Sequence, residues 1–157
     1  MTVSGITTFL WFDREAEEAA NFYVSLFPQS QLGSISYYPE GSQLPAGTVL
    51  TVEFEIFGQP FVCLNGGPQF PHTEAISFQV SCDTQEEVDH LWNSLIANGG
   101  AESQCGWCKD KFGVSWQIIP KALSQAMSSS DPEVSSYAIQ AMLQMRKIII
   151  ADLTKSS

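Results

Sequence analysis

Two cysteines in the stretch CGWC, Cys105 and Cys108, have the spacing of a redox-active dithiol or of half a zinc site. Dithiol oxidoreductases place this motif at the start of a helix, where one thiolate is stabilised. Here the sequence predicts a strand over 102–109, in which residues three apart lie about 10 Å apart and point to opposite faces. A disulfide tolerates about 7 Å between Cα atoms. We therefore expect free thiols; no second pair completes a zinc site, although Cys63 and Cys82 stay open as further ligands.

Glu53 is the carboxylate that the strand pattern favours for proton transfer. Glu53 alternates with apolar residues on a predicted strand and would leave the helix-covered side, where a pocket would suit a general base. The alternative is a glutamate on a solvated strand surface. The two histidines, His72 and His90, lie in a linker and on a predicted helix, which favours turn or surface roles.

Aromatic and amide side chains on the same strands suit the binding of a small planar molecule. The aromatic residues that could stack on a ligand, or pack in the core instead, are Phe9, Trp11 and Trp107. The amides that could orient its polar edges are Asn65, Gln79 and Gln117.

These residues are positioned by an internal repeat with an offset of 70 residues. In both copies an alternating strand, at 6–12 and at 76–82, runs into an aspartate and then into an amphipathic helix. The second helix starts with Thr84 and Glu87 in capping-box spacing and ends at Gly99 and Gly100. The apolar positions of the two helices are Ala16, Ala19, Ala20, Tyr23, Leu26 and Phe27, and Val88, Leu91, Trp92, Leu95 and Ile96.

Further strands follow each helix. They are predicted at 32–38, 48–57 and 60–65, with Gly58-Gln59 as a hairpin turn, and at 102–109 and 114–119, joined by DKFG. We thus predict a single α+β domain over residues 1–157. It comprises two βαβββ modules, at about 5–67 and 73–120 with the second shortened, and a helical tail at about 121–155.

The tail contains one well-marked helix start. Asp131 and Pro132 have the types of an N-cap and a first helical residue. The apolar residues expected on one side of this helix, to cover the domain or a partner subunit, are Val134, Ala138, Ala141, Met142 and Met145.

Strand alternation separates a helix-covered face from a second face. The residues expected under the helices are Ile6, Leu10, Phe12, Ile76, Phe78, Val80, Cys82, Leu50, Val52, Phe54, Ile56 and Trp116. The residues expected to line a ligand cleft on the second face are Thr7, Phe9, Trp11, Ser77, Gln79, Ser81, Thr51, Glu53, Glu55, Cys105 and Trp107.

Several motifs resemble one family over residues 5–150. They are LWFDREAEEAANFYVSLFP, TVEFEIFGQPFVCLNGGP, TEAISFQVSC, EEVDHLW and CGWCKDKFGVSWQIIP. They are similar to the PhnB-like, demethylubiquinone methyltransferase-like branch of the vicinal oxygen chelate (glyoxalase/bleomycin resistance/dioxygenase) superfamily. The resemblance implies a U-shaped half-barrel sheet with helices outside, usually in a homodimer. The fourth position of CGWC is usually apolar in this pattern, so Cys108 takes a small hydrophobe's place.

The resemblance also identifies where metal-dependent relatives carry their ligands, on the first and last strand of each module. The matching residues here are Thr7, Ser77, Asn65 or its neighbour, and Gln117. Hydroxyls and neutral amides bind divalent transition metals poorly, so we expect no metal. We expect no cofactor either, because the pair Gly66-Gly67 is followed by proline, whereas an S-adenosylmethionine site usually needs a glycine-rich turn that opens a helix.

The charge composition of the chain makes some classes of binding partner unfavourable. Acidic residues outnumber basic ones 17 to 7, for a net charge of −10, which disfavours nucleic acid and anionic membranes. The start has neither a basic n-region nor a long apolar run, so we expect a cytoplasmic protein. The sequence predicts a metal-free small-molecule-binding protein that binds an aromatic or amphipathic ligand in the cleft of its sheet. The alternatives are an enzyme (a lyase, isomerase or dioxygenase, or the methyltransferase of the family label, which no motif supports) and an interaction module working through the tail helix.

Overall fold

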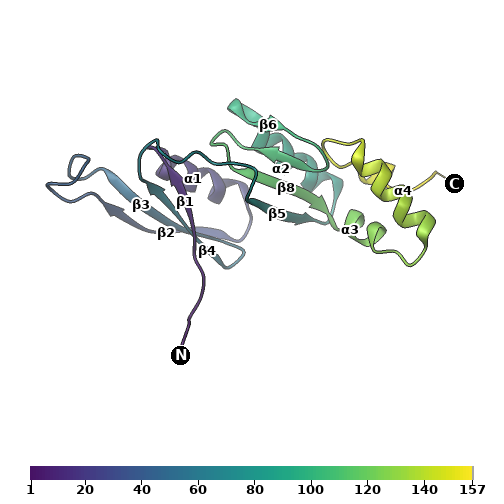
Figure 1. Ribbon diagram of the computed structural model, residues 1–157, viewed down its shortest axis with the longest axis horizontal. Coiled ribbons are helices and arrows are strands. Elements are labelled where there is room, and N and C mark those ends of the chain that lie inside the picture. Colours follow the sequence, from purple (N-terminus) through teal and green to yellow (C-terminus); the bar gives the residue numbers. More distant parts are fainter. Residues whose placement is uncertain (157) are drawn as a thin grey trace. The chain divides into compact units, whose positions relative to one another are not determined.

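Each repeat forms a four-stranded mixed sheet with a helix on one face in the computed structural model, which describes residues 1–156 (Figure 1). The chain divides into two compact units: unit 1 covers Met1–Pro71, and unit 2 begins at His72. The fold is α+β, as the sequence predicts. Each face of a sheet that lies away from its helix is called the open face below.

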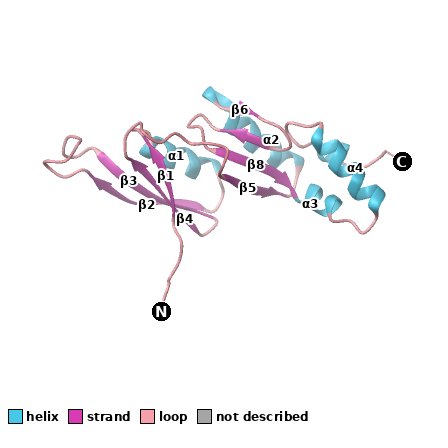
Figure 2. Ribbon diagram, in the orientation of Figure 1, coloured by secondary structure: helices cyan, strands magenta, loops and turns pink. Residues whose placement is uncertain are grey.

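Unit 1 has the strand order β1-β4-β3-β2, with β1 parallel to β4 and the other pairs antiparallel. Its elements are β1 (Thr8–Phe12), α1 (Ala16–Leu26), β2 (Ser30–Tyr37), β3 (Val49–Ile56) and β4 (Gln59–Asn65). Helix α1 packs against β3, β4 and β2 (Figure 2). The predicted apolar stripe of α1 is confirmed, because all six of its residues are buried, with Tyr23 stacked on Phe54.

Unit 2 repeats this arrangement with the strand order β5-β8-β7-β6. Its elements are β5 (Ser77–Cys82), α2 (Gln85–Ile96), η1 (Ala97–Gly99), β6 (Ala101–Glu102), β7 (Trp107–Lys109), β8 (Ser115–Pro120), α3 (Lys121–Met127), α4 (Pro132–Leu143) and η2 (Ile150–Asp152). The capping box of α2 is confirmed: the Thr84 hydroxyl accepts from the backbone N–H of Glu87, whose carboxylate accepts from that of Thr84. Trp116 is buried on the helix side, as predicted.

The predicted strand over 102–109 is wrong. The chain forms two short strands there, β6 and β7, because Cys105 and Gly106 adopt left-handed backbone conformations with φ of 58° and 83°. The second module is therefore a full βαβββ unit and is not shortened. The first hairpin turn is also displaced by one residue, to Phe57 and Gly58, so that Gln59 belongs to β4 and pairs with Ile56.

Two residues expected under the helices are exposed instead. Ile6 is 89% and Ile76 is 72% exposed, because each precedes the first residue of its strand and lies outside the sheet that the helix covers. On the long strand β3 the predicted alternation between a buried and an exposed face is observed: Val52, Phe54 and Ile56 are buried, and Glu53 is exposed.

The C-terminal tail contains the two α-helices α3 and α4 and then the short 3-10 helix η2. The N-cap is confirmed, since the Asp131 carboxylate accepts from the backbone N–H of Glu133. Helix α4 ends at Leu143, before Met145, and the β-branched run 148–150 that follows does not continue it. Ile148 and Leu153 are buried with residues of β8 and α3. Within residues 1–156, no helix is long and apolar enough to span a membrane.

Candidate functional site

The open face of unit 1 is hollowed. A pocket of about 300 Å³ lies over β2, β3 and β4, and the predicted residues Thr7 and Glu53 line it. Thr7 lies one residue before β1, and Glu53 stands in a row with Val62 and Phe9 across three strands. Phe9 is 60% exposed beside this pocket on the same face.

The pocket combines polar and apolar walls. Its polar groups come from Thr7, Gln31, Glu53 and Glu55, and its apolar surface includes Pro60 and Val62. The Gln31 amide donates to the Glu55 carboxylate at 3.1 Å, which fixes one polar edge. Its volume is at the lower end of the range for small-molecule binding sites.

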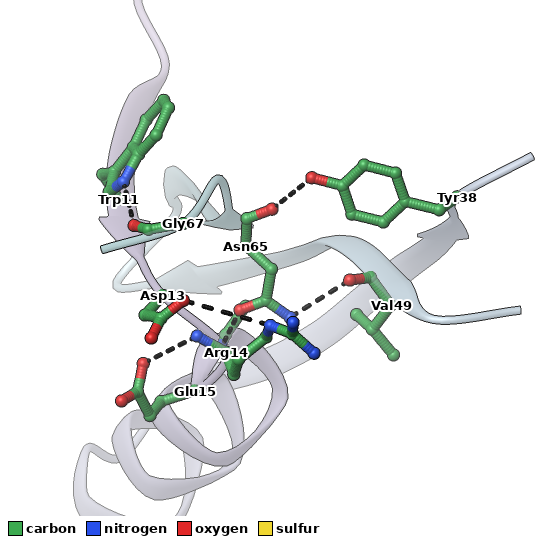
Figure 3. Close-up of polar contacts among 9 residues, drawn as sticks. Trp11, Asp13, Arg14, Glu15, Tyr38, Val49, Asn65 and Gly67 are labelled. Atoms are coloured by element: carbon green, nitrogen blue, oxygen red, sulfur yellow. Dashed lines mark hydrogen bonds and ion pairs between the residues drawn. The ribbon is translucent and has the colours of Figure 1, made fainter. Parts of the chain in front are cut away.

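Trp11 is held in one orientation at the other end of β1 (Figure 3). Its indole Nε1 donates to the carbonyl of Gly67 at 2.8 Å, and its ring meets Phe70 edge-on at 5.0 Å between centroids. The ring lies directly over Gly66, where an added Cβ would come within 2.3 Å of it. This fixed, half-buried aromatic faces the same side as Phe9.

Asn65 serves the helix side of the sheet rather than the open face. Its Oδ1 accepts from the backbone N–H of Ala16 at 2.9 Å, and its Nδ2 donates to the carbonyl of Val49 at 3.1 Å (Figure 3). The sequence predicts Asn65 among the ligand-facing residues, but the register places Leu64 opposite Trp11 and leaves Asn65 buried beside α1. The amide thus holds the first turn of α1, which has no side-chain cap of its own.

The open face of unit 2 brings four predicted residues together. Gln79, Gln117 and Trp107 form one row across β5, β8 and β7. Gln117 donates from Nε2 to the Ser77 hydroxyl at 2.8 Å. The amide row and the half-exposed indole form a polar and aromatic surface within this unit.

The CGWC stretch is a structural turn. The backbone N–H groups of Cys105 and Gly106 donate to the carbonyls of Met145 and Arg146, both at 2.8 Å. An added Cβ at Gly106 would lie 2.8 Å from Ile119 and 3.2 Å from Ile148. The turn therefore binds the C-terminal tail through these backbone hydrogen bonds. No local sequence pattern indicates this contact, because the tail residues lie 40 positions further along the chain.

The prediction of free thiols is confirmed, but the extended strand on which it is based is replaced by a turn at Cys105 and Gly106. Cys63, Cys82 and Cys108 are buried, and Cys105 is half-buried. Burial raises the pKa of Cys82 to about 11 and that of Cys108 to about 12, with nearby carboxylates adding to both. Both thiols are therefore protonated and unreactive near neutral pH.

We expect Cys105 alone to react with a thiol reagent such as 5,5′-dithiobis(2-nitrobenzoate) in the folded protein at pH 8. All four cysteines should react after unfolding in guanidinium chloride. A Cys105→Ser variant should lose the single fast phase, and fast reaction of a second thiol in that variant would contradict the burial of the others.

Further contacts join the tail to unit 2. The Gln85 amide donates to the Ile148 carbonyl at 3.0 Å and accepts from the Ile150 N–H at 2.8 Å. Glu102 accepts from the indole of Trp92 at 3.0 Å and from Arg146 at 3.3 Å. These two bonds, the one from Trp92 foremost, lower the pKa of Glu102.

This pKa shift predicts a pH dependence of stability. Because the folded pKa lies below the ordinary value of 4.5, the contribution of Glu102 is present above that value and is lost as pH falls through the folded pKa. The free energy of unfolding in urea should therefore be higher for the native protein than for Glu102→Gln at pH 7, with the difference shrinking below about pH 4.5. A difference that does not change with pH would contradict this, and Glu133→Gln, at an exposed site on α4, is the control.

Asp110 is a buried carboxylate that the sequence reasoning did not single out. It is 2% exposed, and its Oδ1 accepts from the backbone N–H groups of Phe112 and Val114 at 2.9 and 3.1 Å. Its Oδ2 accepts from the indole of Trp116 at 2.9 Å. Asp110 thereby fixes the turn between β7 and β8, and the DKFG turn signal was the available clue.

The donor groups at the positions that carry metal in some relatives do not form a ligand set here. Ser77 and Gln117 bond to each other, and the Asn65 amide is committed to α1 and β3. Over residues 1–156, no three His, Cys, Asp or Glu side chains gather in a metal-ligating cluster. These residues do not fit a divalent transition metal.

A family model described as 3-demethylubiquinone-9 3-methyltransferase matches residues 4–119. The chain belongs to this family. It is 41% identical to the putative 3-demethylubiquinone-9 3-methyltransferase (PhnB protein) from Bacillus cereus, over 74% of this chain and 99% of that one, with a TM-score of 0.68. The PhnB-like branch that the sequence motifs indicate is thus confirmed.

Two more distant structures share the fold alone. A Pseudomonas aeruginosa protein is 20% identical, over 75% of this chain and 98% of its own, with a TM-score of 0.60. The fosfomycin resistance protein FosX from Listeria monocytogenes is 12% identical, over 86% of this chain and 99% of its own, with a TM-score of 0.53. A search of curated proteins gives no match. The family match ends at residue 119, so α3, α4 and η2 lie outside it.

The methyltransferase family name raises the question of an S-adenosylmethionine site, and the glycine pair of unit 1 does not fit one. Gly66 and Gly67 follow β4 without opening a helix, and the space above Gly66 is taken by the ring of Trp11. The Trp11 indole therefore occupies the space over Gly66 that a nucleoside would need.

Replacing Gly66 with alanine should expel the Trp11 indole and break its bond to Gly67, with a loss of about 1 to 3 kcal/mol in stability from overpacking. The measurement is the tryptophan emission maximum, which should shift to the red in Gly66→Ala and not in a Trp11→Phe background. Gly5→Ala is the matched control, because its Cβ would meet nothing within 4 Å. An unchanged spectrum would show that the ring is not held there.

Proposed function

We propose that the protein binds a small aromatic or amphipathic molecule on its open sheet faces, without a metal ion. The observation that carries this proposal is the 300 Å³ pocket of unit 1, where carboxylate and amide groups stand beside apolar surface. The exposed ring of Phe9 offers a stacking surface next to it. In unit 2, the row Gln79, Gln117 and Trp107 offers a second polar and aromatic surface.

The roles of the pocket residues follow from their chemistry. Thr7 and Gln31 supply hydrogen-bonding groups to a ligand's polar edge, and Val62 and Pro60 contact its apolar body. Glu53 is exposed, so it favours ligands that carry a hydrogen-bond donor or a positive charge. No covalent or redox step is required.

A thermal-shift screen of small aromatic and amphipathic compounds tests the proposal. A compound present at 100 times its Kd should stabilise the protein by about 2.7 kcal/mol and raise Tm by about 5 to 10 °C. Its Kd should rise at least ten-fold in Glu53→Gln and remain unchanged in Glu17→Gln, an exposed glutamate on α1. Failure of every compound to bind, or equal binding to both variants, would count against this pocket.

Two further experiments distinguish metal-free binding from the enzymatic alternatives. Binding should be unaffected by EDTA, and loss of binding after chelation would overturn the metal-free part. The bound compound should be recovered unchanged by mass spectrometry, with and without S-adenosylmethionine. A product that forms in the native protein and not in Glu53→Gln would instead favour an enzyme that uses this carboxylate.

A further inference from the structure

Two of the four asparagines of the chain precede a glycine, at Asn65-Gly66 and at Asn98-Gly99. The backbone nitrogen of the following residue can attack the side-chain carbon Cγ of an asparagine and close a five-membered cyclic imide. Glycine favours this reaction, because it has no side chain to hinder the approach and its backbone rotates freely. The folded chain presents these two dipeptides in opposite ways.

Asn65 is protected from this reaction by the sheet and by α1. It is 3% exposed, and it pairs with Phe12 in the ladder between β1 and β4. Its Oδ1 accepts from the N–H of Ala16, and its Nδ2 donates to the carbonyl of Val49 (Figure 3). Ring closure at Asn65 would break both bonds, so we expect none in the folded protein.

Asn98 lies in η1, the single 3-10 turn that joins α2 to β6. Asn98 and Gly99 are both exposed, and both have left-handed backbone conformations, with φ of 55° and 111°. Ring closure requires rotation about the Cα–C bond of Asn98, where ψ is 35°. The hydrogen bonds of a single 3-10 turn have poor geometry, and an exposed turn opens at a small cost in free energy. Asn98 can therefore reach the reactive conformation without unfolding of the sheet.

The reaction at Asn98 needs only water. The Gly99 nitrogen forms a bond to Cγ of Asn98, the bond from Cγ to the side-chain nitrogen breaks, and ammonia leaves with the proton that Gly99 loses. Water then opens the cyclic imide at one of its two carbonyl carbons. Opening at Cγ gives aspartate. Opening at the main-chain carbonyl carbon gives isoaspartate, in which the backbone runs through the former side chain.

The turn has little room for the extra backbone carbon of isoaspartate. Gly100 follows at once, and a Cβ added there would lie 2.6 Å from the Cα of Ile96 and 2.7 Å from the carbonyl oxygen of Lys109. Strand β6 begins at the next residue and contains Glu102, which accepts from Trp92. Lengthening the backbone just before Gly100 is therefore expected to displace β6.

Both products also place a new negative charge beside the end of α2. Asn98 lies two residues beyond Ile96, the last residue of that helix, and the last turn of α2 contains no basic residue. The C-terminal end of a helix carries a partial negative charge, so a carboxylate there is unfavourable. Aspartate adds this charge alone, whereas isoaspartate adds the charge and the backbone carbon.

We propose that Asn98 is a site of spontaneous deamidation through a cyclic imide, and that its isoaspartate product displaces β6 and destabilises unit 2. The same dipeptide at Asn65 does not react in the folded chain.

Peptide mapping by mass spectrometry, after incubation of the full chain at about 37 °C and pH 8, tests the modification. Chymotrypsin cuts after Leu64 and Leu95, so Asn65 and Asn98 fall in separate peptides. The Asn98 peptide should be deamidated at least about ten-fold faster than the Asn65 peptide in the folded protein, and at a similar rate in guanidinium chloride. A folded-state rate at Asn98 no higher than that at Asn65 overturns the proposal.

Two variants separate the effects of charge and backbone length. Asn98→Gly keeps a φ of 55° without strain and removes the amide, so incubation should leave its mass at this peptide and its Tm unchanged. Asn98→Asp adds the charge alone and should lower Tm by about 1 to 4 °C. The isoaspartate form, separated by ion exchange and identified by electron-transfer fragmentation, should lose more. An isoaspartate form as stable as Asn98→Asp overturns the displacement of β6.

Discussion

Replacing Asp110 with asparagine is expected to lower the free energy of unfolding by about 2 to 4 kcal/mol. The carboxylate accepts three hydrogen bonds with almost no exposure to solvent: two from backbone N–H groups and one from the Trp116 indole. Asparagine has one acceptor oxygen, so its NH₂ group must face at least one of these donors. A buried donor left without an acceptor costs its full desolvation.

Urea unfolding followed by tryptophan fluorescence measures this, because Trp116 itself reports on the site. Asp152→Asn is the control, since Asp152 is exposed at η2 in the same unit, and it should change stability by less than about 0.5 kcal/mol. Equal effects of the two substitutions would show that the Asp110 bonds contribute nothing net. Asp110→Ala should be at least as damaging as Asp110→Asn.

Gly106→Ala is expected to release the C-terminal tail and destabilise unit 2. The residue has a φ of 83°, and a Cβ there would lie 2.8 Å from Ile119, 3.1 Å from the Ile118 carbonyl and 3.2 Å from Ile148. The left-handed conformation costs an alanine about 1 to 2 kcal/mol, and overpacking adds about 1 to 3 kcal/mol. We expect a total loss of about 2 to 5 kcal/mol.

The contribution of the tail can be separated from that of the backbone. Gly113→Ala has a similar φ of 87°, but its nearest contact is at 3.9 Å, so it carries the conformational cost without the clash. Trypsin cleavage after Arg146 and Lys147 should be about ten-fold faster in Gly106→Ala than in Gly113→Ala. Equal cleavage rates would mean that the turn does not hold the tail.

Features that depend on neighbouring residues could be predicted from the sequence. The start of α2 follows from Thr84 and Glu87, three residues apart, and that of α4 follows from Asp131 and Pro132. The strand alternation of β3 placed Glu53 on the open face. In each case the physical cause lies within one turn or one strand.

Features that depend on distant partners could not be predicted. The turn at Cys105 forms around carbonyls of Met145 and Arg146, so CGWC read alone resembles a strand or a redox motif. From its amide group, the sequence predicts that Asn65 faces a ligand. That amide instead accepts a hydrogen bond from Ala16, 49 residues away in the sequence, which no local pattern indicates. Strand parity was also unable to locate the two register shifts between β2 and β3, one between Leu32 and Ile35 and one between Ser36 and Tyr37.

The same Asn65 contact bears on the order in which the two helices form during folding. Helix α2 carries its capping box in its own sequence, so its first turn can be stabilised before any tertiary structure exists. Helix α1 has no such cap, and its first N–H finds an acceptor only when β4 has reached its place in the sheet. A long loop must close before that contact forms. Two modules with the same architecture are therefore expected to fold by different routes, with α2 forming early and the start of α1 forming late.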